Sequence, residues 1–198
     1  MMKHMTLKAI ATACDGTYYG PEENLETEVS GIAIDSRKIE TNWLFAATVG
    51  ERVDGHSFIE SCYEKGALCC LGEKEYAYNG HSYIQVTSTF QALKDIAEYY
   101  RSTLEIPVVG ITGSVGKPST KEMIASVLGV KFNTLKTAGN FNNEVGLPLT
   151  VFNIREEHEA AVLEMGISDF GEMHRLSKVA RPNICVITNI GFCHLQHH

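Results

Sequence analysis

The sequence feature that most constrains the fold is a glycine-rich turn placed between an apolar run and a helical pattern. The apolar run covers residues 106–111, and the turn reads Gly113-Ser-Val-Gly116-Lys117. Helical spacing continues to Gly129, on a face that we expect to comprise Thr120, Ile124, Val127 and Leu128. A strand, turn and helix in this order present backbone N–H groups and a helix N-terminus to an anion, and the lysine adds a positive charge. The unit predicts a phosphate-binding loop, with a purely structural glycine turn as the alternative.

Two departures from the usual phosphate-loop pattern change what this loop is expected to do. Ile111 stands where the longer G-x-x-x-x-G-K-[ST] pattern has its first glycine, and Pro118 stands where that pattern has Ser or Thr. A proline offers neither a hydroxyl for Mg²⁺ nor an N–H for phosphate, although the first turn of a helix tolerates it. Pro118 therefore weakens the prediction of catalysis more than it weakens the prediction of the fold.

Strands alternate with helices along the 198 residues, which predicts an α/β protein with parallel strands joined by right-handed crossovers. A capping pattern at Ser88 opens a helix that leads into the glycine-rich turn, and we place a domain boundary near residue 103. The expected domains are therefore 1–103 and 104–198. The predicted strands cover residues 29–35, 43–48, 67–71, 83–86, 106–111, 132–137, 160–165 and 183–188.

Charge and composition argue against several classes of protein. The net charge of −7 comes without a basic stripe, which disfavours a nucleic-acid partner. No apolar run approaches the roughly 18 residues of a membrane span, and residues 1–5 lack the apolar segment of a secretory signal. None of the six cysteines forms a C-x-x-C pair, so reduced and mostly buried thiols are favoured over a metal site or disulfides. These features predict a cytoplasmic protein.

The chemistry is expected at the carboxyl ends of the second domain's strands, where ligands bind in sheets of this kind. Glu164 interrupts the apolar run at residues 160–165, and His194 follows the predicted strand at 183–188. A buried carboxylate needs a partner, and near a triphosphate Mg²⁺ is a natural one. A carboxylate at a strand end that accepts backbone N–H bonds is the alternative for Glu164, and a structural role is the alternative for His194.

Two further polar clusters allow more than one interpretation. Asn140, Asn142 and Asn143 fall in a glycine-containing segment, and asparagines are common in turns. Asp35-Ser36-Arg37 follows a predicted strand and offers a carboxylate, a hydroxyl and a guanidinium. This second cluster either holds a polar ligand or is an ordinary solvated strand end.

Several motifs in a fixed order resemble the Mur ligase family of bacterial cell-wall precursor synthesis. Residues 34–37, 44–47, 50–59 and 65–67 resemble the family's UDP-binding domain. Residues 112–117, 139–148, 164–166 and 189–195 resemble the start of its ATPase domain. Within the family, the resemblance is to the members that add D-alanyl-D-alanine to UDP-MurNAc-tripeptide. The implied fold is a small α/β UDP-binding domain followed by a partial parallel-sheet domain of the P-loop type.

The resemblance implies a mechanism and roles for individual residues. ATP would phosphorylate the terminal carboxylate of the UDP-linked peptide, and the amine of the dipeptide would then attack the acyl phosphate. Lys117, Glu164 and His194 would be catalytic, with Glu164 and His194 serving Mg²⁺. Residues from the loop and its helix would hold ATP, namely Gly113, Ser114, Val115, Gly116, Lys117 and, as a poor substitute for the missing hydroxyl, Ser119. Asp35, Ser36 and Arg37 would lie at the UDP end, and Asn140, Asn142 and Asn143 would face the join between substrate and nucleotide.

The departures from the family pattern set the remaining expectations. Family members carry Thr or Ser where this chain has Pro118, and they continue beyond the equivalent of His198, so we expect an inactive fragment that self-associates through an incomplete sheet. A ligase that adds a single amino acid and a non-catalytic module that binds a UDP-sugar-peptide are the alternatives. An unrelated P-loop transporter or GTPase would leave residues 1–100 unexplained.

Overall fold

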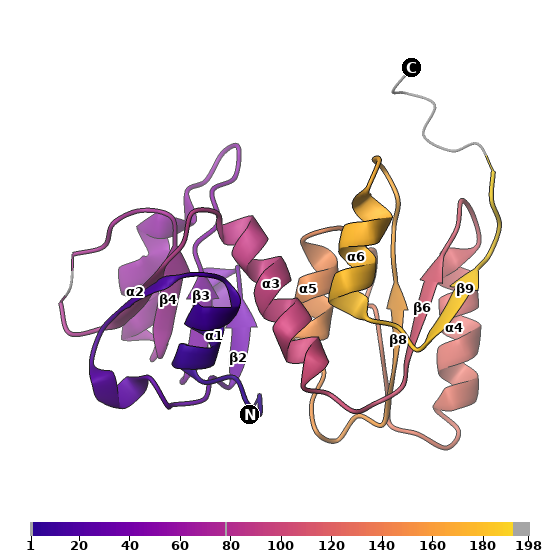
Figure 1. The fold of residues 1–198 in the computed structure, drawn as a ribbon, viewed down its shortest axis with the longest axis horizontal. Coiled ribbons are helices and arrows are strands. Elements are labelled where there is room, and N and C mark those ends of the chain that lie inside the picture. Colours follow the sequence, from indigo (N-terminus) through magenta and orange to yellow (C-terminus); the bar gives the residue numbers. More distant parts are fainter. Residues whose placement is uncertain (1, 78, 192–198) are drawn as a thin grey trace. The chain divides into compact units, whose positions relative to one another are not determined.

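The computed structural model describes residues 2–77 and 79–191, and the chain divides into two compact units, Met1–Tyr100 and Arg101–His198 (Figure 1). Each unit has its own sheet, and each is described by itself. The domain ranges expected from the sequence, 1–103 and 104–198, remain a prediction because they also assign a binding role to each part.

The first unit is built on a five-stranded mixed sheet in the order β1-β5-β4-β3-β2. Four strands pair in parallel and β1 pairs with β5 in the antiparallel sense. The strands are β1 (Thr17–Tyr19), β2 (Gly31–Ala33), β3 (Trp43–Ala46), β4 (Cys69–Gly72) and β5 (Ser82–Gln85). The helices are α1 (Leu7–Ala13), α2 (Ile59–Glu64) and α3 (Thr89–Ser102), with 3₁₀ turns at η1 (Glu22–Asn24), η2 (Ser36–Lys38) and η3 (Gly55–Phe58).

The core of the first unit contains most of the cysteines as free thiols. Cys62, Cys69 and Cys70 are fully buried, and Cys62 and Cys70 pack with Phe45 and Tyr83. Burial raises the pKa of the Cys14 thiol to about 11, so this group stays protonated and behaves as a small apolar side chain. Cys185 is exposed, and Cys193 lies outside the described residues. The prediction of reduced, mostly buried thiols therefore holds for the described cysteines of the first unit.

The second unit is built on a four-stranded parallel sheet in the order β7-β8-β6-β9, which confirms the α/β class and the parallel pairing expected from the sequence. The strands are β6 (Val108–Thr112), β7 (Thr134–Lys136), β8 (Ala160–Glu164) and β9 (Ile184–Ile187). The helices are α4 (Lys117–Leu128), α5 (Gly146–Val151) and α6 (Glu172–Ala180). None of the helices in the described ranges is both long enough and apolar enough to cross a membrane.

Helices cover both faces of the second sheet (Figure 1). On one face, Val109, Ile111 and Val162 pack against Ala125 of α4. On the other face, Gly110 lies so close to Met165 and Pro182 that an added Cβ would be 2.7 Å from one and 3.0 Å from the other. Both faces of the central strands β6 and β8 are therefore buried, as expected for parallel strands, whereas the edge strand β9 is largely exposed.

The buried face of α4 differs from the expected one. Val127 is 72% exposed, and Lys121 and Ala125 are the buried residues of the helix. The pattern Lys121, Ile124, Ala125 and Leu128 follows the i, i+3, i+4, i+7 spacing of a helix face. The expectation was wrong at Val127 because it did not consider a charged residue for the buried face, whereas a lysine occupies a sheet-facing position.

Candidate functional site

The glycine-rich turn adopts the tight geometry that its sequence indicates. Gly113 and Gly116 have positive φ angles of 133° and 83°, which L side chains rarely adopt. An added Cβ at Gly113 would collide with Oγ1 of Thr188 and would lie 2.9 Å from the carbonyl oxygen of Asn189. Both glycines are therefore needed for the chain to pass from β6 into α4.

The segment that follows β9 holds this turn in place. Asn189 accepts hydrogen bonds from the backbone N–H of Ser114, through its carbonyl oxygen at 3.2 Å, and from that of Val115, through Oδ1 at 3.0 Å. Oγ of Ser114 lies 2.9 Å from the carbonyl oxygen of Gly191 and 3.0 Å from its nitrogen. The sequence correctly predicted that the segment after β9 lies at the carboxyl edge of the sheet, but it predicted no role for Asn189.

The N-terminus of α4 faces the turn with a lysine in its first position. Nζ of Lys117 donates a 2.7 Å hydrogen bond to the carbonyl oxygen of Gly113, so the side chain folds back over the loop. The helix begins at Lys117 with Pro118 next, and Gly116 provides no side-chain cap. The first N–H groups of a helix have no intrahelical acceptor, and here the proline removes one of them. The remaining donors and the ammonium group suit an anion such as phosphate.

Glu164 ends β8 beside the start of this loop. It pairs in register with Ile111 of β6, and it is 2% exposed. Its Oε1 accepts a 2.7 Å hydrogen bond from Nδ2 of Asn142, whereas Oε2 has no hydrogen-bond partner within the described residues. An unpartnered buried carboxylate oxygen is costly, and a hard cation such as Mg²⁺ would satisfy it. The observed donor set therefore fits the predicted metal role of Glu164.

A buried lysine, which the sequence did not single out, accompanies Glu164. Lys121 is 4% exposed, and its Nζ lies 3.7 Å from Oε2 of Glu164 and 3.6 Å from Oε1 of Glu122. Glu122 in turn pairs with Lys136 at the end of β7. Four charges thus alternate in sign along the carboxyl edge of the sheet. The only sequence signal for Lys121 is its helical spacing with Ala125 and Leu128.

The three predicted asparagines have different surroundings. Asn142 contacts Glu164, as described above. Oδ1 of Asn143 accepts hydrogen bonds from the N–H groups of Val145 and Gly146, which is the turn role that was the alternative for this cluster. Asn140 is exposed, and its carbonyl oxygen accepts a bond from the N–H of Asn142. The structure therefore brings only Asn142 to the carboxylate.

The second predicted metal ligand, His194, lies outside the described residues. Within residues 2–77 and 79–191, no three His, Cys, Asp or Glu side chains converge as a metal site. The predicted metal site therefore rests on Glu164, and Ser119, the predicted substitute hydroxyl, is exposed on α4.

In the first unit, the Asp35-Ser36-Arg37 cluster forms a closed pair of charges at the end of β2. Both carboxylate oxygens of Asp35 accept hydrogen bonds from the Arg37 guanidinium, at 2.9 and 2.8 Å. This pairing holds the pKa of Asp35 well below its usual value. The carbonyl oxygen of Ser36 accepts a bond from Nζ of Lys65 at 2.7 Å. Arg37 is exposed, Asp35 and Ser36 are half-buried, and the cluster is ordered by its own contacts. This arrangement fits both alternatives, a site for a polar ligand and a solvated strand end.

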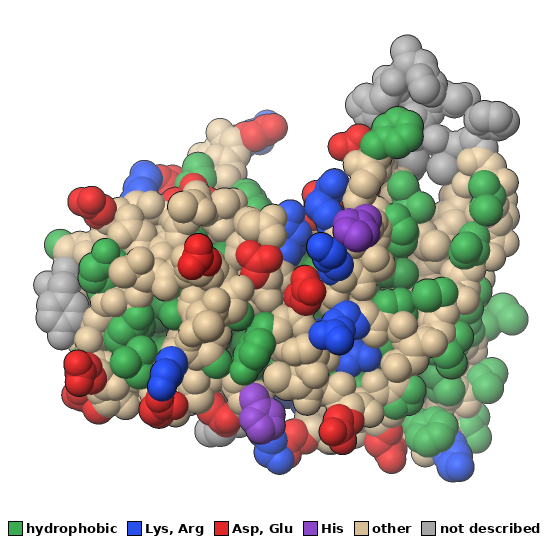
Figure 2. Space-filling view, viewed as in Figure 1, with side chains coloured by type: hydrophobic (Ala, Val, Ile, Leu, Met, Phe, Trp, Pro, Cys, Tyr) green, Lys and Arg blue, Asp and Glu red, His purple; other side chains and the backbone are tan. Residues whose placement is uncertain are grey.

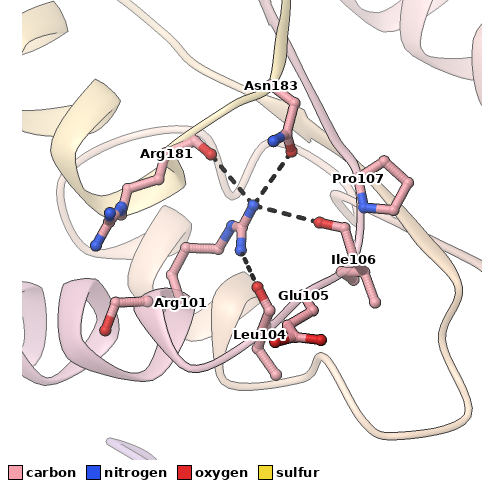
Figure 3. Close-up of a pocket in the computed structure, with 8 residues that line it drawn as sticks. Arg101, Leu104, Glu105, Ile106, Pro107, Arg181 and Asn183 are labelled. Carbon is pink, nitrogen blue, oxygen red and sulfur yellow. Dashed lines mark hydrogen bonds between the residues drawn. The ribbon is translucent and has the colours of Figure 1, made fainter.

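A polar cavity of about 490 Å³ lies at the opposite, amino end of the second sheet (Figure 3). Arg101 is buried there and donates to the carbonyl oxygens of Ala180, Leu104 and Arg181 at 3.0, 2.8 and 3.2 Å. Burial lowers the pKa of its guanidinium, and the nearby Arg181 adds to this effect. Because the guanidinium N–H groups donate to backbone carbonyl oxygens, Arg101 has a structural role. The cavity is separate from the phosphate loop.

Comparisons with known proteins match both units. The model "Mur ligase family, catalytic domain" matches residues 28–109, and the model "Mur ligase middle domain" matches residues 111–198. The UDP-N-acetylmuramoyl-tripeptide–D-alanyl-D-alanine ligase of Bacillus subtilis is 45% identical over 193 residues, which are 96% of this chain and 42% of that protein. The Escherichia coli enzyme of the same name is 33% identical over 98% of this chain and 42% of its own length.

Solved structures agree with these matches. The crystal structure of MurF from Acinetobacter baumannii has a TM-score of 0.85 at 33% identity and covers 96% of this chain and 42% of its own. The MurF ligase from Thermotoga maritima, solved in complex with ADP, has a TM-score of 0.75 at 34% identity, covering 83% of this chain and 38% of its own. The chain thus spans about two fifths of the length of these relatives.

Proposed function

The chain belongs to the Mur ligase family, whose members are ATP-dependent amide ligases, and we propose that it supplies the UDP-substrate and ATP sites of a ligase adding D-alanyl-D-alanine to UDP-MurNAc-tripeptide. The reaction would proceed through an acyl phosphate at the terminal carboxylate of the tripeptide. One observation carries the proposal: the glycine-rich loop and the buried Glu164, one oxygen of which accepts no hydrogen bond within the described residues, lie on neighbouring strand ends of one parallel sheet.

Each group at the loop has a role in this proposal. Lys117 and the N–H groups of the first turn of α4 would bind the ATP phosphates, together with Gly113, Ser114, Val115 and Gly116. Asn142 would orient Glu164 through the bond to Oε1, so that Oε2 points to the metal. Glu164, with His194, would hold Mg²⁺, which offsets the phosphate charge during transfer when it is bound.

The first unit would hold the UDP part of the substrate at the end of β2. Asp35 and Arg37 are already fixed by their mutual bonds, so a ligand would meet an ordered pair rather than two free side chains. Ser36 adds a hydroxyl at the same place. Asn140 and Asn143 remain predictions for the substrate side.

Pro118 supports a second candidate function. Without the hydroxyl and the N–H of a Thr or Ser at this position, Mg·ATP would be held less tightly, and the chain would act as a non-catalytic module that binds the UDP-sugar-peptide. A ligase that adds a single amino acid has less support, because the relatives named above, at 33–45% identity, are all D-alanyl-D-alanine ligases.

Calorimetric titration of the chain with UDP-MurNAc-tripeptide and, separately, with Mg·ATP tests the proposal. Binding of both ligands, with ATP binding lost in Lys117→Ala, is the expected result. Binding of the UDP-peptide alone would favour the non-catalytic module. Binding of neither ligand would refute both functions.

A further inference from the structure

A fully enclosed lysine at the phosphate loop has no role in the proposed function. Lys121 lies one turn after Lys117 on α4, and a lysine is rarely buried unless it is paired. Its ammonium faces the one oxygen of Glu164 that lacks a hydrogen-bond partner, at 3.7 Å, which is too long for a hydrogen bond. The lysine thus forms an ion pair with the carboxylate but no hydrogen bond to it.

A metal ion on Oε2 of Glu164 would have to share this oxygen with the ammonium. Mg²⁺ lies about 2.1 Å from its oxygen ligands, so a dication there would be within a few ångströms of Nζ. Like charges at that separation repel strongly in a buried environment. Since the side chain of Lys121 is enclosed and also faces Glu122, it has little room to withdraw.

We propose that Lys121 excludes divalent metal ions from Glu164 until a nucleotide is bound. The inference rests on the proposed function, in that phosphates at the loop bring the negative charge that offsets the dication. Lys121 is then a positioning residue that couples the two binding events. Thermodynamic reciprocity requires that nucleotide raises the affinity for metal by the same factor by which metal raises the affinity for nucleotide.

The proposal is tested by titrating the 198-residue chain with Mn²⁺ in the absence of nucleotide. The concentration of free Mn²⁺ is measured by electron paramagnetic resonance, which gives the affinity for the metal. Lys121→Gln keeps a donor for Oε2 but removes the charge, and we expect it to bind Mn²⁺ about tenfold more tightly than the wild type. Lys121→Arg keeps the charge and should bind as weakly as the wild type. Adding ADP should reduce the difference between Lys121→Gln and the wild type.

Lys136→Gln is the matched control. It changes the net charge of the chain equally, but Lys136 pairs with Glu122 rather than with Glu164. No tenfold gain is expected there, and the gain in Lys121→Gln should vanish when Glu164→Gln is added. The proposal would be overturned if Lys136→Gln raised the affinity for Mn²⁺ as much as Lys121→Gln does, or if Lys121→Gln did not raise it. It would also be overturned if the higher affinity of Lys121→Gln persisted after Glu164→Gln was added.

If circular dichroism shows that Lys121→Gln does not fold, the single variant Glu164→Gln tests the proposal instead. Because the ammonium excludes metal from Glu164, this variant should leave binding of Mn²⁺ alone unchanged and should weaken binding of Mn²⁺ only with ADP present. Weaker binding of Mn²⁺ alone would refute the role of Lys121. The metal-only comparison involves no nucleotide, so a failure of ADP to bind any variant would count against the proposed function instead.

Discussion

Asn142 and Glu164 are joined by a single 2.7 Å hydrogen bond from the side-chain amide to Oε1, which fixes one oxygen of the carboxylate, whereas the other is buried and accepts no hydrogen bond within the described residues. The two residues are 22 positions apart in the sequence, and the carbonyl oxygen of Asn142 also accepts a bond from the N–H of Gly166, just beyond β8. The asparagine segment is thereby anchored to the strand end that carries the carboxylate.

Asn142→Ala should weaken binding of Mg·ATP about tenfold. A hydrogen bond to a charged group contributes about 1.5–3 kcal/mol, and its loss also frees the carboxylate to rotate. Calorimetry on the variant measures this effect, with Asn140→Ala as the control because Asn140 is exposed and its side chain does not bond to Glu164. Equal losses in the two variants would contradict a specific role for Asn142.

Pro118→Thr should strengthen binding of Mg·ATP by about tenfold. The substitution restores both the N–H at the second position of α4 and a hydroxyl, each of which can contribute about 1 kcal/mol or more. Pro118→Ala restores the N–H alone and should give a smaller gain. Identical affinities for all three proteins would show that position 118 does not limit the site.

Gly113→Ala should destabilise the second unit by roughly 1–3 kcal/mol, because it adds a collision with Thr188 to an unfavourable φ angle. Gly139→Ala is the matched control, since Gly139 has a φ of 51° and open space around it, and its cost should be nearer 1 kcal/mol. Urea unfolding followed by far-ultraviolet circular dichroism compares the two. A similar cost for both would mean that the loop relaxes around the new methyl group.

The first unit should lose stability in acid through Asp54. The ammonium of Lys74 and the ring and backbone of His56 hold the pKa of Asp54 well below its usual value. A carboxyl whose pKa is lower in the folded state stabilises that state above its unfolded pKa of about 3.9, and this contribution is lost as the pH falls toward the folded pKa. Asp54→Asn should therefore flatten the fall in unfolding free energy below about pH 4.

The single tryptophan, Trp43 on β3, allows this acid effect to be followed in the first unit by fluorescence. Urea titrations between pH 2 and pH 6 on the wild type and on Asp54→Asn give the dependence of the unfolding free energy on pH for each protein. Parallel pH profiles would show that the Asp54 contacts do not persist in solution.

Self-association through the second unit is the remaining prediction. Figure 2 shows hydrophobic side chains gathered over the part of the surface formed by α4 and β9, where Ile184 and Ile187 are more than half exposed. The edge strand β9 also offers unpaired backbone groups. Ile187→Lys should lower the sedimentation-derived association constant, whereas Phe170→Ser, at an exposed position in the loop between β8 and α6, should not.

The features that sequence predicted well are local. The glycine-rich turn, the strands around it and the end of the helix at Gly129 follow from residues that lie within a few positions of one another. The short strand β1 was missed because its partner in the sheet, β5, is more than sixty residues away, and three residues carry too little periodicity to be recognised.

Lys121 was missed for a different physical reason. A lysine on a helix is exposed by default, and only the tertiary pairing with Glu164 and Glu122 makes its burial tolerable. The bond between Asn142 and Glu164 likewise depends on a fold that brings a turn to a strand end. Sequence reasoning therefore named Glu164 and Asn142 as site residues, but it predicted neither the bond between them nor the burial of Lys121 beside the carboxylate.

The carbonyl contacts of Arg101 make the two ends of the second sheet mechanically unequal. At the amino end, its guanidinium binds the chain before β6 to the chain before β9, and Asn183 adds a 2.9 Å bond to the N–H of Val108. At the carboxyl end, the central strands lead into a glycine turn and a carboxylate oxygen that accepts no hydrogen bond within the described residues. When a ligand binds, the strand ends should therefore move most at the carboxyl end of the sheet. The amino ends, which Arg101 holds together, should move least.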